Sequence, residues 1–376
     1  MWPSYSVSCR KDVDSLLRKG GSLSAYRANP LFPSWTGPAK GSWAERLERD
    51  AERRFGVRHA IAVNSGTAAL HAALESLRLK PGAVVVTTSY SFSATSSAIL
   101  LAGYTPRYAD VDPYSFNITP ETVKKVFTKD VKAILPVSLF GGLSDVHGLK
   151  QFGVPVVEDA CQAVGARDQY GYSGTHADVG CYSFNGGKQV PAGEAGMVVT
   201  NDDAKAERIR LFSNHRENFY SKEVSGNGRM NELTACVAYH GLLDLDDRNQ
   251  RRRDLANKVF TDFLGMVTLD MAKEFGEFSI PRKFGENHAL YVCPVKVKRN
   301  RGLFIKRMAK RGIPVGAGYI QPVLSRYPAF RKYARGPLPV VEELSSKTLC
   351  VLSTLTPDRP LSYAKKVAEA MRESLR

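Results

Sequence analysis

Short apolar runs and amphipathic stretches alternate along most of this 376-residue chain. Runs rich in valine, isoleucine and alanine predict strands at 60–63, 83–87, 108–111, 132–137, 154–158, 178–184 and 197–200. The stretches between them predict helices at 67–79, 92–102 and 120–127. Short, continuous apolar strands separated by helices indicate a mostly parallel sheet that helices cover on both faces.

The start of the chain shows a different pattern. Residues 1–40 are rich in Gly, Pro and Ser and predict an irregular N-terminal segment. A helix is expected next, ending near Phe55. Ser42 is its cap, and Glu45 follows three residues later, which is the spacing of a capping box.

The pattern changes again after residue 231. A long helical stretch extends to about residue 263, and strands then mix with helices near 289–297, 301–311 and 363–375. A single hydrophobic core rarely exceeds roughly 250–300 residues. We therefore expect a large α/β domain over 41–245 and a smaller α+β domain over 246–376.

The chain carries a formal net charge of +16, which favours anionic partners without determining the fold. Nucleic acid and a phosphorylated small substrate are the two candidate partners. The densest basic cluster, Arg248 with Arg251, Arg252 and Arg253, lies on the predicted long helix. No groove of interleaved basic and aromatic residues, typical of single-strand binders, is evident. We therefore favour the small anionic substrate.

Cysteines and apolar segments narrow the class of protein further. None of the six cysteines forms a CxxC pair, so the pattern indicates free buried thiols and no metal site. The first residues contain no apolar leader, and no run of about 18 apolar residues occurs. We expect a cytoplasmic protein without a membrane segment.

Candidate chemistry lies where the predicted strands end, because ligands of parallel sheets bind beyond the carboxyl ends of the strands. Ser65, Gly66 and Thr67 follow the first strand and open a helix. Free N–H groups at a helix start form an anion site, although simple helix capping explains these residues as well. Phe92 follows the second strand and either stacks on a flat ring or packs in the core.

Two later strand ends carry ionisable groups. Glu158 and Asp159 end an apolar strand, where two acids are costly unless they are paired. Asp159 suits a protonated pyridine nitrogen, whereas a helix cap or a structural salt bridge is the alternative. Lys188 closes a glycine-rich turn after the strand 178–184. Its amine is suited to condense with a carbonyl, although a plain surface lysine is the alternative.

Together the residues at these strand ends supply four groups. They are an anion-binding turn at a helix start (the anion cup), an aromatic ring that can stack, a carboxylate for a pyridine nitrogen and an amine for an aldehyde. Those four groups are what a pyridoxal 5'-phosphate (PLP) site requires. We therefore expect PLP as the cofactor, with Lys188 and Asp159 as the catalytic residues.

Ordered motifs carry a family resemblance over about residues 40–375. They read Asn-Ser-Gly-Thr-Ala-Ala-Leu at 64–70, Glu-Asp-Ala-x-Gln at 158–162, Ser-Phe-x-x-x-Lys at 183–188, Gly-Glu-x-Gly-Met-Val-Val-Thr at 193–200, Asn-x-Arg-Met at 227–230 and Gly-Ile-Pro with Tyr319 and Pro322 at 312–322. This series resembles the DegT/DnrJ/StrS-type sugar aminotransferases. The resemblance implies the type I fold of PLP-dependent aminotransferases, with a seven-stranded-type sheet in the large domain.

The resemblance implies a role for each matching residue. Lys188 forms the covalent bond to PLP and moves the proton, and Asp159 pairs with the pyridine nitrogen. Gln162 contacts the hydroxyl side of the ring, and Phe92 stacks on the ring.

It also assigns the phosphate of PLP to Ser65, Gly66, Thr67 and Ser183. Asn227 reaches that phosphate from the other subunit, which implies a homodimer with shared active sites.

The chain departs from the family pattern at three places, one of which is Asn227, flanked here by Gly226 and Gly228 where relatives often carry aromatic residues. The family's Gly-Glu-Gly-Gly turn has Ala195 at its third position, and this alanine is strained if the backbone there requires positive φ. The first 40 residues match the family's usual opening poorly.

We expect transamination from glutamate or glutamine to a keto-sugar, with a nucleoside-diphosphate-linked keto-deoxysugar favoured. His215, Arg216 and Tyr319 are the candidates for contacts with the substrate. Amination of an inosose-type or aminohydroxybenzoate-type ketone is one alternative, and a non-catalytic PLP-fold binding protein is another.

Overall fold

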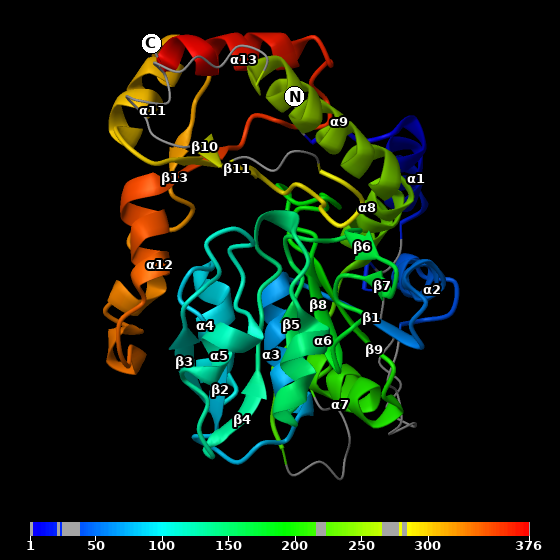
Figure 1. Cartoon of the computed structure of the whole chain (residues 1–376). Coiled ribbons are helices and arrows are strands. Elements are labelled where there is room, and N and C mark those ends of the chain that lie inside the picture. Colours follow the sequence, from blue (N-terminus) through cyan, green and yellow to red (C-terminus); the bar gives the residue numbers. More distant parts are fainter. Residues whose placement is uncertain are drawn as a thin grey trace.

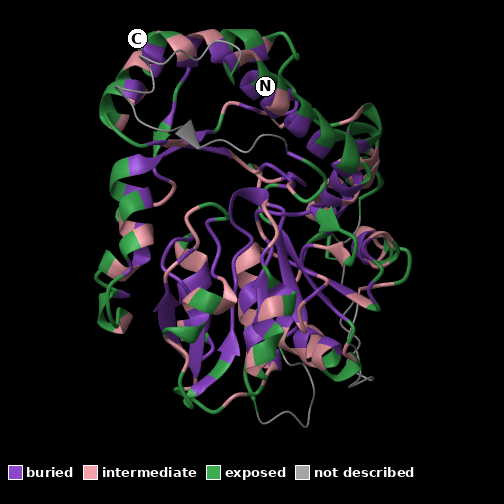
Figure 2. Cartoon of the chain, viewed as in Figure 1, coloured by how far each residue is buried: buried purple, intermediate pink, exposed green. Residues whose placement is uncertain are grey.

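The computed structural model describes residues 3–20, 23–24, 38–215, 223–264, 278–279 and 284–375. A large unit built around a twisted sheet lies below a smaller unit formed by the C-terminal third of the chain (Figure 1). Buried residues concentrate in the strands and on the inner faces of the helices (Figure 2).

The central sheet of the large unit is mixed but mostly parallel. Its strands are β1 (His59–Val63), β2 (Val84–Thr88), β3 (Thr105–Ala109), β4 (Val131–Ile134), β5 (Val157–Asp159), β8 (Val179–Ser183) and β9 (Gly196–Thr200). Single parallel bridges join the sides of β4 and β5, which gives the order β3-β2-β4-β5-β8-β9-β1. Strand β9 alone runs opposite to the other six strands, so the predicted mostly parallel sheet is confirmed.

Helices cover both faces of this sheet, as the apolar strands require. They are α2 (Trp43–Phe55), α3 (Gly66–Ser76), α4 (Ser93–Leu101), α5 (Pro120–Lys124), α6 (Val146–Leu149), α7 (Asp203–Ser213) and α8 (Glu232–Leu243). Alternate residues of β1 enter different cores: Ile61 and Val63 pack with α3, whereas Ala60 and Ala62 pack with α2 and α8. Short 3-10 turns (η1, Leu139–Gly141; η2, Lys150–Phe152) and the hairpin β6 (Arg167–Asp168) with β7 (Gly171–Tyr172) complete the unit.

The small unit is the expected α+β layer. Its antiparallel sheet has the order β10 (Phe278–Ser279), β11 (Cys293–Val297), β13 (Leu349–Leu352) and β12 (Gly316–Ala317). The helices are α9 (Leu245–Leu264), α11 (Arg301–Lys310), α12 (Pro339–Glu343) and α13 (Tyr363–Ser374), with short turns η3 (Leu324–Arg326), η4 (Arg331–Tyr333) and η5 (Leu344–Thr348). Among the described helices, none is both long and apolar enough to span a membrane.

Helix α9 links the two units. Leu245 at its start belongs to the core of the large unit, whereas Leu255 and later residues belong to the core of the small one. One continuous helix therefore crosses the predicted boundary between residues 245 and 246. The division into domains itself stays a prediction.

The expectation of an irregular segment over 1–40 is wrong for its first half. Residues Val7–Lys19 form helix α1, whose cap Ser6 accepts a hydrogen bond from the N–H of Cys9. This helix packs against α8, and Cys9 is buried there. The stretch 25–37, which contains the Pro-rich part, lies outside the described residues.

The predicted cap of α2 is partly confirmed. The Ser42 hydroxyl accepts from the Glu45 N–H at 3.1 Å. The Glu45 carboxylate, however, accepts from the N–H of Gly41, one residue before the position that a capping box requires.

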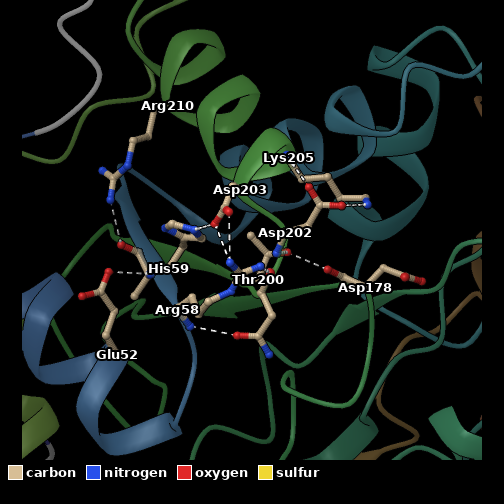
Figure 3. A network of polar contacts seen from close by, with 11 residues as sticks. Glu52, Arg58, His59, Asp178, Thr200, Asp202, Asp203, Lys205 and Arg210 are labelled. Atoms are coloured by element: carbon tan, nitrogen blue, oxygen red, sulfur yellow. Dashed lines mark hydrogen bonds and ion pairs between the residues drawn. The ribbon is translucent and has the colours of Figure 1, made fainter.

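A polar network fixes one edge of the sheet (Figure 3). His59 Nε2 lies 2.7 Å from Asp203 Oδ1, and Arg58 donates to Asp203 Oδ2 at 3.0 Å. The hydrogen bond with His59 is the main cause that lowers the pKa of Asp203. His59 begins β1 whereas Ser65 follows its other end, so this network stabilises the end of the sheet away from Ser65.

A buried ion pair joins α2 to α7 across the same edge. Glu48 is only 4% exposed, accepts from the N–H of Ala62 at 2.8 Å, and pairs with Arg210 at 3.0 Å. Burial raises the pKa of Glu48, and the charge of Arg210 opposes that rise. The charged form of Glu48 therefore depends on Arg210.

We expect Arg210→Met to lower the free energy of unfolding by about 3 kcal/mol at pH 7, because it leaves a buried carboxylate without its partner. The loss shrinks as the pH falls toward 5, since a raised pKa lets folded Glu48 bind a proton before the unfolded chain does. Urea unfolding at both pH values measures this. The control Arg49→Met removes an exposed pair and costs under about 1 kcal/mol; equal losses at both pH values contradict the prediction.

Candidate active site

The carboxyl ends of β1, β2, β5 and β8 meet at one edge of the sheet, and a cavity of about 200 Å³ opens there. Nine residues that the sequence singled out line it: Ser65, Gly66, Thr67, Phe92, Asp159, Gln162, Ser183, Lys188 and Tyr319. Strand direction explains the convergence, because parallel strands deliver their following residues to the same edge.

The first turn of α3 forms one wall of the cavity. Ser65 caps the helix, and its hydroxyl accepts from the Ala68 N–H at 3.1 Å. A Cβ atom on Gly66 would lie 2.8 Å from Ser183 Cβ and 3.2 Å from Cys161 Sγ, so only glycine fits there. Gly66 and Thr67 belong to a first turn whose N–H groups have no acceptors within the helix. This wall is suited to an anion.

Asp159 lies at the floor and is 4% exposed. Its Oδ2 accepts from the Thr95 hydroxyl at 2.8 Å, and its Oδ1 accepts from the Cys161 N–H at 3.2 Å. No described residue forms an ion pair with it, so the salt-bridge alternative finds no support in the part of the chain that the structure describes. The carboxylate is left facing the cavity.

Glu158, the acid next to Asp159 in β5, has a structural role. Glu158 is 1% exposed and accepts from the hydroxyls of Ser138 at 2.6 Å and Ser173 at 2.9 Å, and from the N–H of Gly174 at 2.8 Å. Burial raises the pKa of Glu158. Because successive strand residues face opposite sides of a sheet, Glu158 supports the loop behind the cavity while Asp159 faces into it.

Gln162 is held at both ends of its amide. Its Oε1 accepts from the Phe140 N–H at 3.0 Å, and its Nε2 donates to the Tyr319 hydroxyl at 3.1 Å. An amide nitrogen has two hydrogens, so one donor of Gln162 stays available to the cavity. Burial raises the pKa of Tyr319.

Lys188 closes a turn in which its N–H donates to the Asn185 carbonyl at 2.8 Å. Its side chain is half-buried, and Nζ lies 4.0 Å from the centre of the Tyr291 ring, within cation–π range. The N–H of Tyr291 donates to the Phe140 carbonyl at 2.9 Å, which holds the backbone of Tyr291 against the large unit.

Phe92 is the N-cap residue of α4 and is 58% exposed at the cavity. A core-packing role for this side chain therefore does not hold. Its ring offers a flat apolar face to whatever occupies the cavity.

Three predicted site residues do not line this cavity. Asn227 is exposed, and its Oδ1 accepts from the Arg229 N–H at 3.0 Å. His215 is exposed with a φ of 59°, and Arg216 lies outside the described residues. The roles assigned to these residues stay predictions.

The structure adds lining residues that sequence reasoning missed, namely Leu70, Ser91, Ala94, Thr95, Cys161, Asn185, Glu194 and Tyr291. Glu194 accepts from Asn185 Nδ2 at 2.8 Å. The expected strain at Ala195 is absent, because in this turn Gly193 has the positive φ, at 79°. The adjacent Gly196 is needed instead, since a Cβ there would lie 2.4 Å from the Ser65 carbonyl oxygen.

The geometry combines an amine, a buried carboxylate and an anion cup around one cavity, and comparison with known proteins agrees with that chemistry. The chain is 30% identical to a pleiotropic regulatory protein of Geobacillus stearothermophilus, over 88% of this chain and 90% of the relative. It is 30% identical to the 3-oxo-glucose-6-phosphate:glutamate aminotransferase of Bacillus subtilis and 34% identical to the GDP-perosamine synthase of Caulobacter vibrioides. Those two alignments cover 76% and 61% of this chain and 64% of each relative.

Solved structures show the same fold. The chain matches S. venezuelae DesV, solved in complex with a ketimine intermediate, with a TM-score of 0.84 and 27% identity over 98% of this chain and 94% of DesV. The model of the DegT/DnrJ/EryC1/StrS aminotransferase family matches residues 34–372. The chain therefore belongs to this family of PLP-dependent aminotransferases.

Proposed function

We propose that this enzyme moves an amino group from glutamate or glutamine to a keto-sugar, with a nucleoside-diphosphate-linked keto-deoxysugar as the favoured acceptor. One observation carries the proposal: Lys188, Asp159 and the open first turn of α3 line a single cavity. The three groups match the aldehyde, the ring nitrogen and the phosphate of PLP.

The residues present fit this cofactor. Gly66 leaves a cradle that a Cβ would fill, and Ser183 lies beside it. Asp159 is buried and has no charged partner among the described residues. Its carboxylate is therefore suited to pair with a protonated ring nitrogen. Phe92 exposes a ring at the mouth. Ser65, Gly66, Thr67 and Ser183 would hold the phosphate.

Bound PLP supplies a carbonyl carbon for bonding to an amine and a ring that accepts electrons. Lys188 Nζ would be the amine that holds PLP through that carbon, and it would carry the α-proton of the amino donor. Asp159, as an anion, holds a proton on the ring nitrogen. The cavity walls bury Asp159 and leave Lys188 half-buried.

Gln162 and Tyr319 form the remaining polar wall. The free donor of Gln162 suits the ring hydroxyl of PLP. The Tyr319 hydroxyl already accepts from Gln162, so its own hydrogen can be donated to a substrate oxygen. Its raised pKa keeps that hydrogen in place at neutral and moderately alkaline pH.

Two observations support a sugar carrying phosphate as the acceptor. The net charge of +16 attracts anions, and one relative is named a GDP-perosamine synthase. The name of another, which aminates 3-oxo-glucose-6-phosphate with glutamate, supports the donor and keeps a sugar phosphate as a second candidate acceptor. Intact Lys188 and Asp159 argue against a non-catalytic binding protein.

We also propose that Asn227 completes the phosphate site of a partner subunit in a homodimer. Asn227 is exposed and does not line its own chain's cavity. A bridge to Asn214 and a hydrogen bond of 2.9 Å from Asn64 Nδ2 to its carbonyl hold its backbone near the site. His215 and Arg216, which follow Asn214 in the sequence, are proposed as substrate contacts.

The function is tested in two stages. Protein reconstituted with PLP is incubated with glutamate or glutamine, and release of the 2-oxo acid is measured. The amino-loaded protein is then offered keto-sugars linked to nucleoside diphosphates, keto-sugar phosphates and cyclic ketones. Return of the PLP absorbance with the first group supports the proposal. Return only with the second or third group contradicts the favoured acceptor.

Lys188→Ala should abolish turnover, with a loss of at least about 10³-fold, because no other amine in the described part of the cavity can carry the proton. Borohydride reduction followed by mass spectrometry should fix PLP to the wild-type chain and not to this variant. Lys150→Ala removes an exposed lysine and serves as the control. Full activity of Lys188→Ala would falsify the assignment.

Gly66→Ala should weaken PLP binding by tenfold or more, because its methyl group enters the space of Ser183. Fluorescence titration of the cofactor-free protein measures the dissociation constant. Gly302→Ala, in an open helical position with no atom within 4 Å, should leave PLP affinity unchanged. Equal affinities of the Gly66 variant and the wild type would contradict a phosphate cup at this turn.

Tyr319→Phe should lower kcat/KM for the acceptor by about tenfold, since it deletes one hydrogen-bond donor to the substrate. The variant should still bind PLP. Tyr327→Phe, on the same segment but away from the cavity lining, is the matched control. Unchanged kcat/KM for every acceptor would remove Tyr319 from the substrate site.

A further inference from the structure

Two buried hydroxyl groups at the start of α4 lead to Asp159. Ser91 and Thr95 are each 1% exposed, and their oxygens lie 2.8 Å apart. The Thr95 hydroxyl lies 2.8 Å from Asp159 Oδ2. A continuous chain of hydrogen bonds therefore runs from the loop after β2 to the carboxylate at the floor of the cavity.

The direction of this chain follows from the number of hydrogens. A carboxylate is only an acceptor, so the single hydrogen of Thr95 is donated to Asp159. Thr95 cannot then donate to Ser91, and the Ser91 hydroxyl must donate to Thr95. Both hydroxyl dipoles point toward Asp159. Hydrogen bonds in such a chain polarise and strengthen one another in a buried environment.

Asp159 depends on these donors because no described cation is paired with it. Its other oxygen accepts from the Cys161 N–H, at the longer distance of 3.2 Å. The side-chain donor that orients and stabilises the charged form is therefore Thr95.

We propose that Thr95, oriented by Ser91, is a positioning residue that keeps Asp159 an anionic acceptor, so that the shared proton stays on the ring nitrogen of PLP. The inference rests on the role of Asp159 in the proposed function. Phe92 begins the same helix turn. The start of α4 would thus supply the side chain that stacks on the PLP ring, through Phe92. It would also help to keep the ring nitrogen protonated, through Thr95.

The test uses PLP labelled with ¹⁵N in the ring, bound to full-length protein. The ¹⁵N chemical shift reports directly whether the nitrogen carries a proton. Thr95→Val, which removes the hydroxyl and keeps the shape, should move the shift toward that of the unprotonated ring. It should also slow 2-oxo acid release from glutamate by about tenfold. Thr95→Ser should restore both, and Ser91→Ala should show a smaller change of the same sign.

Ser96→Ala is the matched control. It removes another buried hydroxyl of α4, bonded to the Tyr108 hydroxyl at 3.1 Å and not to Asp159. A general loosening of the helix would affect this variant as well, whereas the proposal predicts a wild-type shift. If Thr95→Val does not fold, the shift of Ser91→Ala decides the question alone.

Asp159→Asn separates this inference from the proposed function. A changed ¹⁵N shift in Asp159→Asn together with a wild-type ¹⁵N shift in Thr95→Val overturns the positioning role of Thr95 and Ser91 (the relay). The role of Asp159 is then left intact. Wild-type shifts in both variants overturn the role of Asp159 and the relay with it. Equal changes in Thr95→Val and Ser96→Ala also overturn the relay, because a purely structural effect then explains the data.

Discussion

The close approach of helix α3 to strands β8 and β9 is the constraint on which the site depends. Gly66 lies against Ser183, and Gly196 lies against the backbone of Ser65, with no space for a Cβ at either glycine. This contact brings the amino end of a helix to the same edge as the residues that follow β5 and β8. An anion site and an amine can therefore share a cavity of about 200 Å³.

The strand that carries two adjacent acids shows how the fold separates support from chemistry. Glu158 is surrounded by donors from Ser138, Ser173 and Gly174, and it fastens the loop behind the sheet. Asp159 faces the other side and accepts from Thr95 and Cys161. The alternation of side chains along a strand thus allows one buried carboxyl to be structural and its neighbour to serve the site.

The sequence was sufficient for the residues that follow strands directly, because strand direction alone brings Ser65, Asp159, Ser183 and Lys188 to one edge. It could not reveal Tyr291 and Thr95, whose positions depend on the pairing of the loop 139–142 with 288–291 and on the rotation of α4. The antiparallel direction of β9 could not be predicted from the sequence either, because an apolar run does not show which way its strand runs. Helix α1 was missed because Gly and Ser further along the segment obscured a thirteen-residue amphipathic stretch.

The cavity has walls from both units, and Tyr319 is one of the residues that join them. Its N–H lies 3.4 Å from the Tyr90 hydroxyl, its own hydroxyl meets Gln162, and the nearby Leu324 N–H donates to the Ser89 carbonyl at 3.0 Å. The segment 316–324 is thus fastened to the large unit at three points, while the proposed phosphate and ring-nitrogen contacts lie elsewhere. Replacing this short stretch with the matching one from a relative should therefore change which acceptor is used. The proposed contacts with the phosphate and ring nitrogen of the vitamin-derived cofactor would be kept.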